Sequence, residues 1–265
     1  MACKTKCIKF EHILTDMNIQ EIFGKYKLKS GESKKVTYNG LTISVIKEAS
    51  GWWINSFHSE STEQKKGKFY LTGASDTLIL SAALPSKPLV FKGNDLTVMQ
   101  GQTIRFYIKI PLAVHVYHTK KLEKNKITEI IHTRLSDTWF GEPVGGEAAF
   151  SIGSEFSLSF DETEPAIFES ICPISVTNDS EKPLELERLI IRAENLSLYQ
   201  IKNKILTSLV KLNYKGKDAL STASYVTTRN LHGDKPQLIS DPLSKNTDGT
   251  LKINFHFIRN IYKNI

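Results

Sequence analysis

The chain has 265 residues, 40% of them hydrophobic, and a formal net charge of +7. This length and apolar content suit one large domain or two smaller ones with real cores, and they argue against extensive disorder. The longest apolar runs fall well short of the ~18 residues that a membrane-spanning helix needs. The polar, basic N-terminus lacks the apolar centre of a secretion signal. We therefore expect a soluble, cytoplasmic protein without a transmembrane segment.

The first predicted element is a short helix at 17–23 (MNIQEIF), which Thr15 or Asp16 could cap and Gly24 could end. Strand patterns dominate after it. Apolar and polar residues alternate with a period of two, as on half-buried strands, at 41–49, 103–110, 156–160 and 251–257. Trp52 and Trp53 should point to opposite faces of a further strand, with one of them exposed.

Many short strands separated by turn signals, without strand–helix alternation, predict an all-β, mainly antiparallel fold of β-sandwich architecture. We expect two β-rich halves and one or two short helices near the termini, the last at 257–265. The expected domains are an N-terminal extension (1–22), an N-terminal β-rich domain (23–120) and a C-terminal β-sandwich-like domain (127–265). The lysine-rich segment 118–126 indicates an exposed loop or linker between the two domains.

Charge is unevenly distributed along the chain. Residues 1–130 contain 20 Lys and Arg against 11 Asp and Glu, residues 131–194 contain 4 against 13, and residues 195–265 contain 11 against 4. Acidic and basic segments that pack together would explain this pattern. The alternative is a basic face that binds a polyanion such as nucleic acid or anionic lipid. Dispersed lysines, scarce arginines and missing recognition motifs argue against nucleic acid.

Motifs of well-known enzymes are missing from the sequence, including the GxSxG elbow, the P-loop, the dinucleotide fingerprint and HExxH. Three cysteines predict no disulfide framework, and Cys3 and Cys7 lack the further ligands of a zinc site. His115 and His118 should point to opposite faces of a strand, so they cannot share a metal. We expect no cofactor, metal or catalytic residue. The sequence favours a non-enzymatic protein and leaves an enzyme open.

The segment RLSDTWFGEPVGGEAAF (134–150) is the strongest candidate for a binding site. A tryptophan can stack on a sugar or base, an arginine can pair with an anion, and carboxylates can accept hydroxyl donors. The candidate ligand-binding residues are Arg134, Asp137, Trp139, Glu142 and Glu147. The interpretation that the sequence favours is a loop that reverses into the strand EAAFSI (147–152). In that case Trp139 fills one end of a sandwich and Asp137 caps the turn.

Four blocks of the chain carry a resemblance to a known family. RLSDTWFGEPVGGEAAFSI (134–152) and the block from Glu169 to Tyr199 resemble the domain-of-unknown-function family 432 of archaea and bacteria. FGKYKL (23–28) and IKIPLAVHVY (108–117) are similar to earlier blocks of that family. The resemblance implies an intracellular prokaryotic protein with a β-rich fold, and it transfers no catalytic residue.

Within the last block, ICPISVTN (171–178) and LELERLIIRA (184–193) are expected to form a hairpin, as in immunoglobulin-like sandwiches. Taken together, the observations predict a binding or accessory module that acts with a protein partner or as a homo-oligomer, for example through an exposed sheet edge. The alternative is a small-molecule or carbohydrate site, or a hydrolytic one, around residues 134–147. A third hypothesis is polyanion binding by the basic N-terminal half.

Overall fold

The fold was analysed in a computed structural model, which describes residues 23–38, 40–58, 67–93, 96–133, 135–141, 143–166, 168–201, 203–216, 221–226, 236–244 and 250–252. Apart from Phe23, the helices expected at 17–23 and 257–265 lie outside these residues. The regular secondary structure of the described part is nearly all β-strand, and the strands are mainly antiparallel, which confirms the all-β prediction. Its helical segments are short 3-10 turns, η2 (Glu123–Asn125) and η3 (Ala193–Asn195). No helix in the described part is long and apolar enough to cross a membrane.

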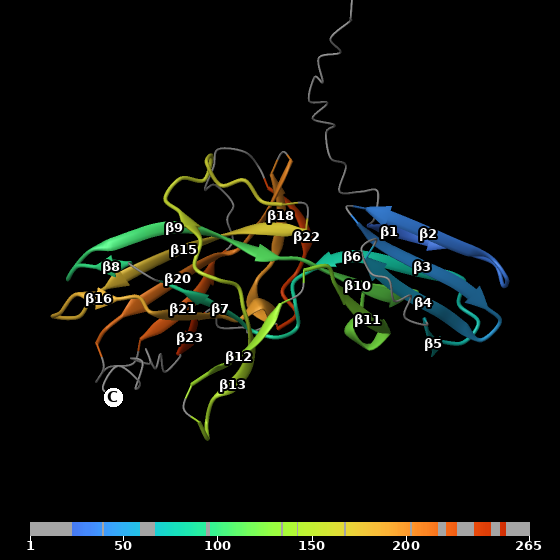
Figure 1. The fold of residues 1–265 in the computed structure, drawn as a ribbon, viewed down its shortest axis with the longest axis horizontal. Coiled ribbons are helices and arrows are strands. Elements are labelled where there is room, and N and C mark those ends of the chain that lie inside the picture. The colour runs from blue at the N-terminus through green and yellow to red at the C-terminus, as the bar shows by residue number, and fades with distance from the viewer. Residues whose placement is uncertain are drawn as a thin grey trace, which may run out of the picture.

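The first sandwich packs two four-stranded sheets face to face (Figure 1). Sheet A has the order β1 (Gly24–Lys27), β6 (Thr77–Ala83), β10 (Ala113–His118) and β11 (Lys126–Ile131). Sheet B has the order β2 (Ser33–Tyr38), β3 (Leu41–Glu48), β4 (Gly51–His58) and β5 (Lys68–Leu71). Alternate residues of both sheets meet in one core, among them Ile43 and Trp52 from sheet B and Leu80 and Val116 from sheet A. Trp52 is fully buried and Trp53 is 42% exposed, as the alternation predicts.

The second sandwich packs a nine-stranded sheet against sheet C. Sheet C has the order β12 (Ser136–Phe140), β13 (Glu147–Ser151), β7 (Leu89–Lys92) and β17 (Arg188–Ile191). The nine-stranded sheet contains β9 (Thr103–Pro111), β14 (Phe156–Ser157), β15 (Glu169–Asn178), β18 (Leu198–Ile201), β19 (Lys204–Thr207), β20 (Leu209–Tyr214), β21 (Thr222–Val226), β22 (Gln237–Ser240) and β23 (Thr250–Lys252). Side chains such as Phe106 and Ile174 from the large sheet meet Phe91 and Ile191 from sheet C in its core.

Strands β9 and β10 join the two sandwiches, because only Leu112 separates them in the chain. β9 pairs with β15 in the nine-stranded sheet, whereas β10 pairs with β6 and β11 in sheet A. Segment 118–126 connects β10 to its own neighbour β11 and contains η2. The sheets thus combine strands from both predicted ranges, and the division into domains 23–120 and 127–265 stays a prediction.

The hairpin expected from 171–178 and 184–193 does not form. β15 pairs with β9, β19 and β20, while β16 (Leu184–Glu185) pairs with β8 (Thr97–Val98) and β17 pairs with β7. Asn178 explains the change of direction, because its amide nitrogen donates to the carbonyls of Val98 and Lys182, both at 2.8 Å. These bonds hold the turn against β8, so the following strand leaves β15 and enters another sheet.

Candidate functional site

The segment singled out in the sequence forms the hairpin β12–β13, which projects from the body of the molecule (Figure 1). Phe140 pairs with Glu147, and the register runs without a shift to Ser136 opposite Ser151. The turn depends on Gly141, whose φ is +109° and whose added Cβ would lie 2.7 Å from the Cα of Gly146. A side chain at that position would be strained and would collide with backbone. The expected reversal into a strand at 147 is therefore confirmed.

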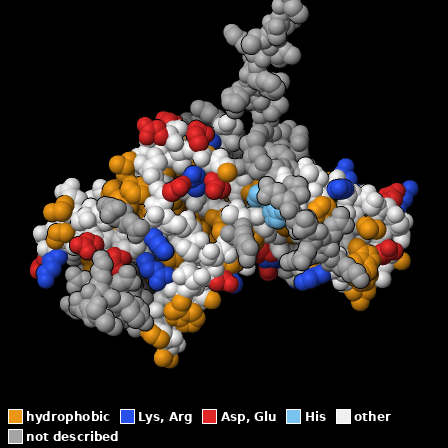
Figure 2. All heavy atoms as spheres, in the orientation of Figure 1, with side chains coloured by type: hydrophobic (Ala, Val, Ile, Leu, Met, Phe, Trp, Pro, Cys, Tyr) orange, Lys and Arg blue, Asp and Glu red, His pale blue; other side chains and the backbone are white. Residues whose placement is uncertain are grey.

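The register divides the candidate residues between two faces. Residues paired directly across an antiparallel ladder share a face, and neighbours along a strand alternate. Asp137 and Trp139 therefore lie on one face, and Phe140 and Glu147 lie on the other. Phe140 is 8% exposed, whereas Trp139 is 47% exposed and Val144 at the tip is 99% exposed. Apolar side chains are visible at the hairpin tip, at the bottom of Figure 2.

Asp137 and Glu147 each have a cationic partner. Lys87 Nζ lies 2.9 Å from Asp137 Oδ1 and 4.7 Å from the ring centroid of Phe150. Arg192 contacts both carboxylate oxygens of Glu147 through its two terminal nitrogens and also lies 3.7 Å from Glu194. Burial tends to lower the pKa of Arg192, but the hydrogen bond to Glu147 and the charges of the two glutamates outweigh burial and raise it. Asp137 and Glu147 therefore anchor the hairpin through their ion pairs.

Arg188 fastens the same hairpin from β17. It donates to the carbonyl of Trp139 at 2.8 Å and to Thr138 Oγ1 at 3.2 Å, and it lies over the ring of Phe140. The exposed Trp139 therefore lies on backbone that Arg188 holds from the opposite face of the hairpin. Of the remaining candidates, Arg134 and Glu142 lie outside the described residues. The structure brings Asp137 and Trp139 together and places Glu147 on the opposite face.

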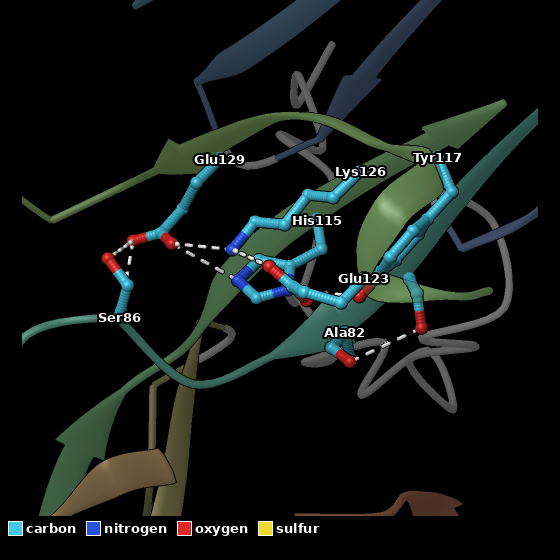
Figure 3. A network of polar contacts seen from close by, with 8 residues as sticks. Ala82, Ser86, His115, Tyr117, Glu123, Lys126 and Glu129 are labelled. Carbon is cyan, nitrogen blue, oxygen red and sulfur yellow. Dashed lines mark hydrogen bonds and ion pairs between the residues drawn. The ribbon is translucent and has the colours of Figure 1, made fainter. Parts of the chain in front are cut away.

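Sequence reasoning missed a buried polar network in sheet A (Figure 3). His115 is fully buried, and its Nε2 lies 3.2 Å from Glu129 Oε2 while its Nδ1 lies 3.1 Å from the hydroxyl of Tyr117. Glu129 also accepts from Lys126 Nζ at 3.4 Å and from the backbone N–H of Ser86 at 3.2 Å. Since a carboxylate only accepts, Nε2 carries a proton, and in the neutral ring Nδ1 accepts from Tyr117.

The network holds Glu129 in its charged form. Burial alone would raise its pKa, but hydrogen bonds from His115 and Ser86 and the charges of His115 and Lys126 lower it to about 2. Burial raises the pKa of Tyr117, and the nearby carboxylates of Glu123 and Glu129 add to this effect. The hydrogen bonds of Glu129 therefore tie β10 and β11 to the loop that contains Ser86. The register of the β10–β11 hairpin sets His115 opposite Glu129, but it shifts between Val116 and Tyr117, so the residue spacing in the sequence does not show this pair.

His115 and His118 do point to opposite faces, because they are opposite Ser81 and Leu78 on β6. Within the part of the chain that the structure describes, no group of three His, Cys, Asp or Glu side chains could hold a metal ion.

A pocket of about 200 Å³ lies beside β9 and β14, lined by Tyr107, Lys109, Glu155, Phe156, Ser157, Glu162, Thr163 and Glu164. Two ion pairs link groups at its wall, Lys109 with Glu155 at 3.2 Å and Lys204 with Glu164 at 3.0 Å. Lys204 also donates to the carbonyl of Thr163 at 2.9 Å. These bonds tie the acidic loop at 161–164 to β19 and Glu155 to β9, which is a structural use of their charges.

Neither a curated protein nor a solved structure matches the chain. A family model, described as "Protein of unknown function (DUF432)", matches residues 22–259, including the β12–β13 hairpin and the His115–Glu129 network. By that match over most of its length, the chain belongs to the DUF432 family.

Proposed function

We propose that the protein is a non-enzymatic binding module that contacts a protein partner, or a second copy of itself, through the β12–β13 hairpin. The observation that carries this proposal is the exposure of Trp139 beside the buried Phe140 on a projecting hairpin. Tryptophan is among the residues that contribute most to protein interfaces, where a rigid aromatic side chain fills a pocket on the partner.

The surroundings of Trp139 support a protein partner. Because Arg188 and Arg192 hold the hairpin, little conformational entropy remains to be lost on binding. Within the described residues β12 pairs only with β13, so its other edge can accept a partner strand by β-augmentation. Asp137 and Glu147 pair with cations of this chain, and the side chain of Trp139 is 47% exposed, so a partner can bury apolar surface there.

A small-molecule or carbohydrate site is the second candidate, since Asp137 and Trp139 share one face. A sugar could stack on the indole and donate a hydroxyl proton to the carboxylate. Asp137 is 73% exposed, and neither residue lines the pocket beside β9. This candidate therefore requires a ligand that binds on an open surface.

The test places a photo-crosslinking amino acid at position 144, where the side chain is fully exposed, in the cells that express the protein. A discrete crosslinked band is expected, and Trp139→Ala should abolish it. The matched control is Trp53→Ala, which removes an exposed tryptophan from sheet B and should leave the band unchanged. A band that persists in Trp139→Ala would contradict the proposal. Crosslinking of the purified protein to itself would identify the partner as a second copy.

A further inference from the structure

The outer face of sheet B carries a row of exposed apolar side chains that the β12–β13 hairpin does not touch. Ile46, Trp53 and Phe69 form this row, because they lie directly opposite one another on β3, β4 and β5. Leu71 lies two residues further along β5, opposite Gly51. The four apolar side chains are 38%, 42%, 39% and 78% exposed, in the order of the chain. The rings of Trp53 and Phe69 are in contact, with centroids 5.3 Å apart.

The row has no role in the core beneath it. The side chains that sheet B contributes to the core alternate with these positions, as Val45 and Trp52 do. Isolated exposed apolar residues are normal on any protein, whereas a contiguous group on three adjacent strands marks an interaction surface. Figure 2 shows apolar side chains gathered at the end of the molecule that β4 and β5 form.

One lysine and one glutamate of the four described strands share this outer face with the row. Lys35 is opposite Ser44, and its Nζ lies 5.7 Å from the ring centroid of Phe57 on the same face. Glu48 ends β3 and points to the same side as Ser44. Both charged residues are exposed, and neither forms an ion pair with another described residue. The registers place the other lysines of these strands on the opposite face, namely Lys34, Lys47 and Lys68.

The two charges lie on opposite sides of the apolar row. Lys35 is level with Ser44, two residues before Ile46, and Glu48 lies two residues after Ile46. In a symmetric dimer, a two-fold axis that runs along the row exchanges the two sides. It brings Lys35 of one copy within one strand spacing, about 5 Å along the sheet, of Glu48 of the other. The strands of the two copies then lie within the angle of about 30° that is usual for packed sheets.

The same axis sets large side chains of one copy against small residues of the other. Leu71 lies two residues after Phe69, and Gly67 lies two residues before it, so Leu71 of one copy meets Gly67 of the other. On β4, Asn55 and Gly51 flank the row in the same way and meet each other across the axis. The face is therefore complementary to itself in shape as well as in charge.

We propose that the protein forms a symmetric homodimer in which the outer faces of sheet B pack on each other. The apolar row lies at the centre of this contact, and two Lys35–Glu48 ion pairs form beside it, one on each side of the row. The occupant is a second copy because the face has no net charge that would select a polyanion or a polycation. This contact goes beyond the function proposed for the β12–β13 hairpin and does not use it.

The test is sedimentation velocity of the purified full-length protein at rising concentration. Because a face of four strands is smaller than a standard interface, the series extends to about 500 μM protein. A monomer–dimer equilibrium is expected for the wild type. Lys35→Glu and Glu48→Lys should each weaken it by at least about tenfold, because like charges then meet on both sides of the row. An equimolar mixture of the two variants should dimerise again, since opposite charges meet in the mixed dimer, and a misfolded variant could not be rescued in this way.

A second variant tests the apolar part of the contact without a change of charge. Leu71→Ser should abolish the dimer, whereas Leu158→Ser, at a position 65% exposed in the other sandwich, is the matched control and should have no effect. A monomer at every concentration, a mixture of the charge variants that stays monomeric, or a dimer that persists in Leu71→Ser would overturn the proposal. Loss of the dimer in Trp139→Ala would overturn it too and would assign self-association to the hairpin.

Discussion

Replacement of Glu129 by glutamine removes the charge at the centre of the buried network and keeps the size of the side chain. Glu129 is 15% exposed, and its pKa falls from 4.5 to about 2 in the fold. Each unit of difference in pKa between the unfolded and folded states is worth about 1.4 kcal/mol. The charged form of Glu129 therefore contributes about 3 kcal/mol to the free energy of unfolding. Because the folded pKa is lowered, this stability is fully present above about pH 4.5 and is lost as the pH falls through about 2.

The measurement is urea unfolding of the wild type and of Glu129→Gln from pH 7 to pH 2, followed by tryptophan fluorescence, since Trp52 lies in the core of the same sandwich. The difference in unfolding free energy should be about 3 kcal/mol at pH 7 and should close towards pH 2, where wild-type Glu129 is protonated. Glu123→Gln is the control, because Glu123 is 69% exposed and 3.8 Å from Lys126; it should cost less than about 1 kcal/mol. A difference that stays constant with pH would refute the electrostatic explanation.

Three further outcomes are expected. Phe140→Ala should lower the free energy of urea unfolding by about 3–5 kcal/mol because it removes a buried ring. Trp139→Ala should lower it little, because that side chain is half exposed. Equal losses would argue against the assignment of the two residues to different faces. Gly141→Ala should destabilise the hairpin by about 1–3 kcal/mol, and Gly145→Ala, which meets open space, should not. Cys172 is fully buried, and burial raises its pKa to about 12, so in a variant without the two N-terminal cysteines a thiol reagent should label only unfolded protein.

The period of two in the sequence was sufficient to predict the strands and the class of fold. It worked at 41–49 and 103–110, where the alternate apolar residues of each strand enter one core. It could not predict which strands pair, because the pattern describes the faces of a strand and not its edges. β15 illustrates the difficulty: it is buried on both faces, and its partners come from residues 103–111 and 204–214. Such pairing over long separations leaves no local signal.

In the candidate site, the number of residues in the β12–β13 turn decides which side chains share a face. Phe140 opposite Glu147 leaves six residues in the turn and sets Trp139 opposite Ala148. A register shifted by one residue would set Trp139 opposite Glu147 and would bring Asp137, Trp139 and Glu147 onto a single face, because a slip of one exchanges the faces of a strand. The residue types that suggested a pocket are present in either register. Their grouping depends on the turn at Gly141, and that turn directs Glu147 to Arg192 and leaves Trp139 exposed on the opposite face.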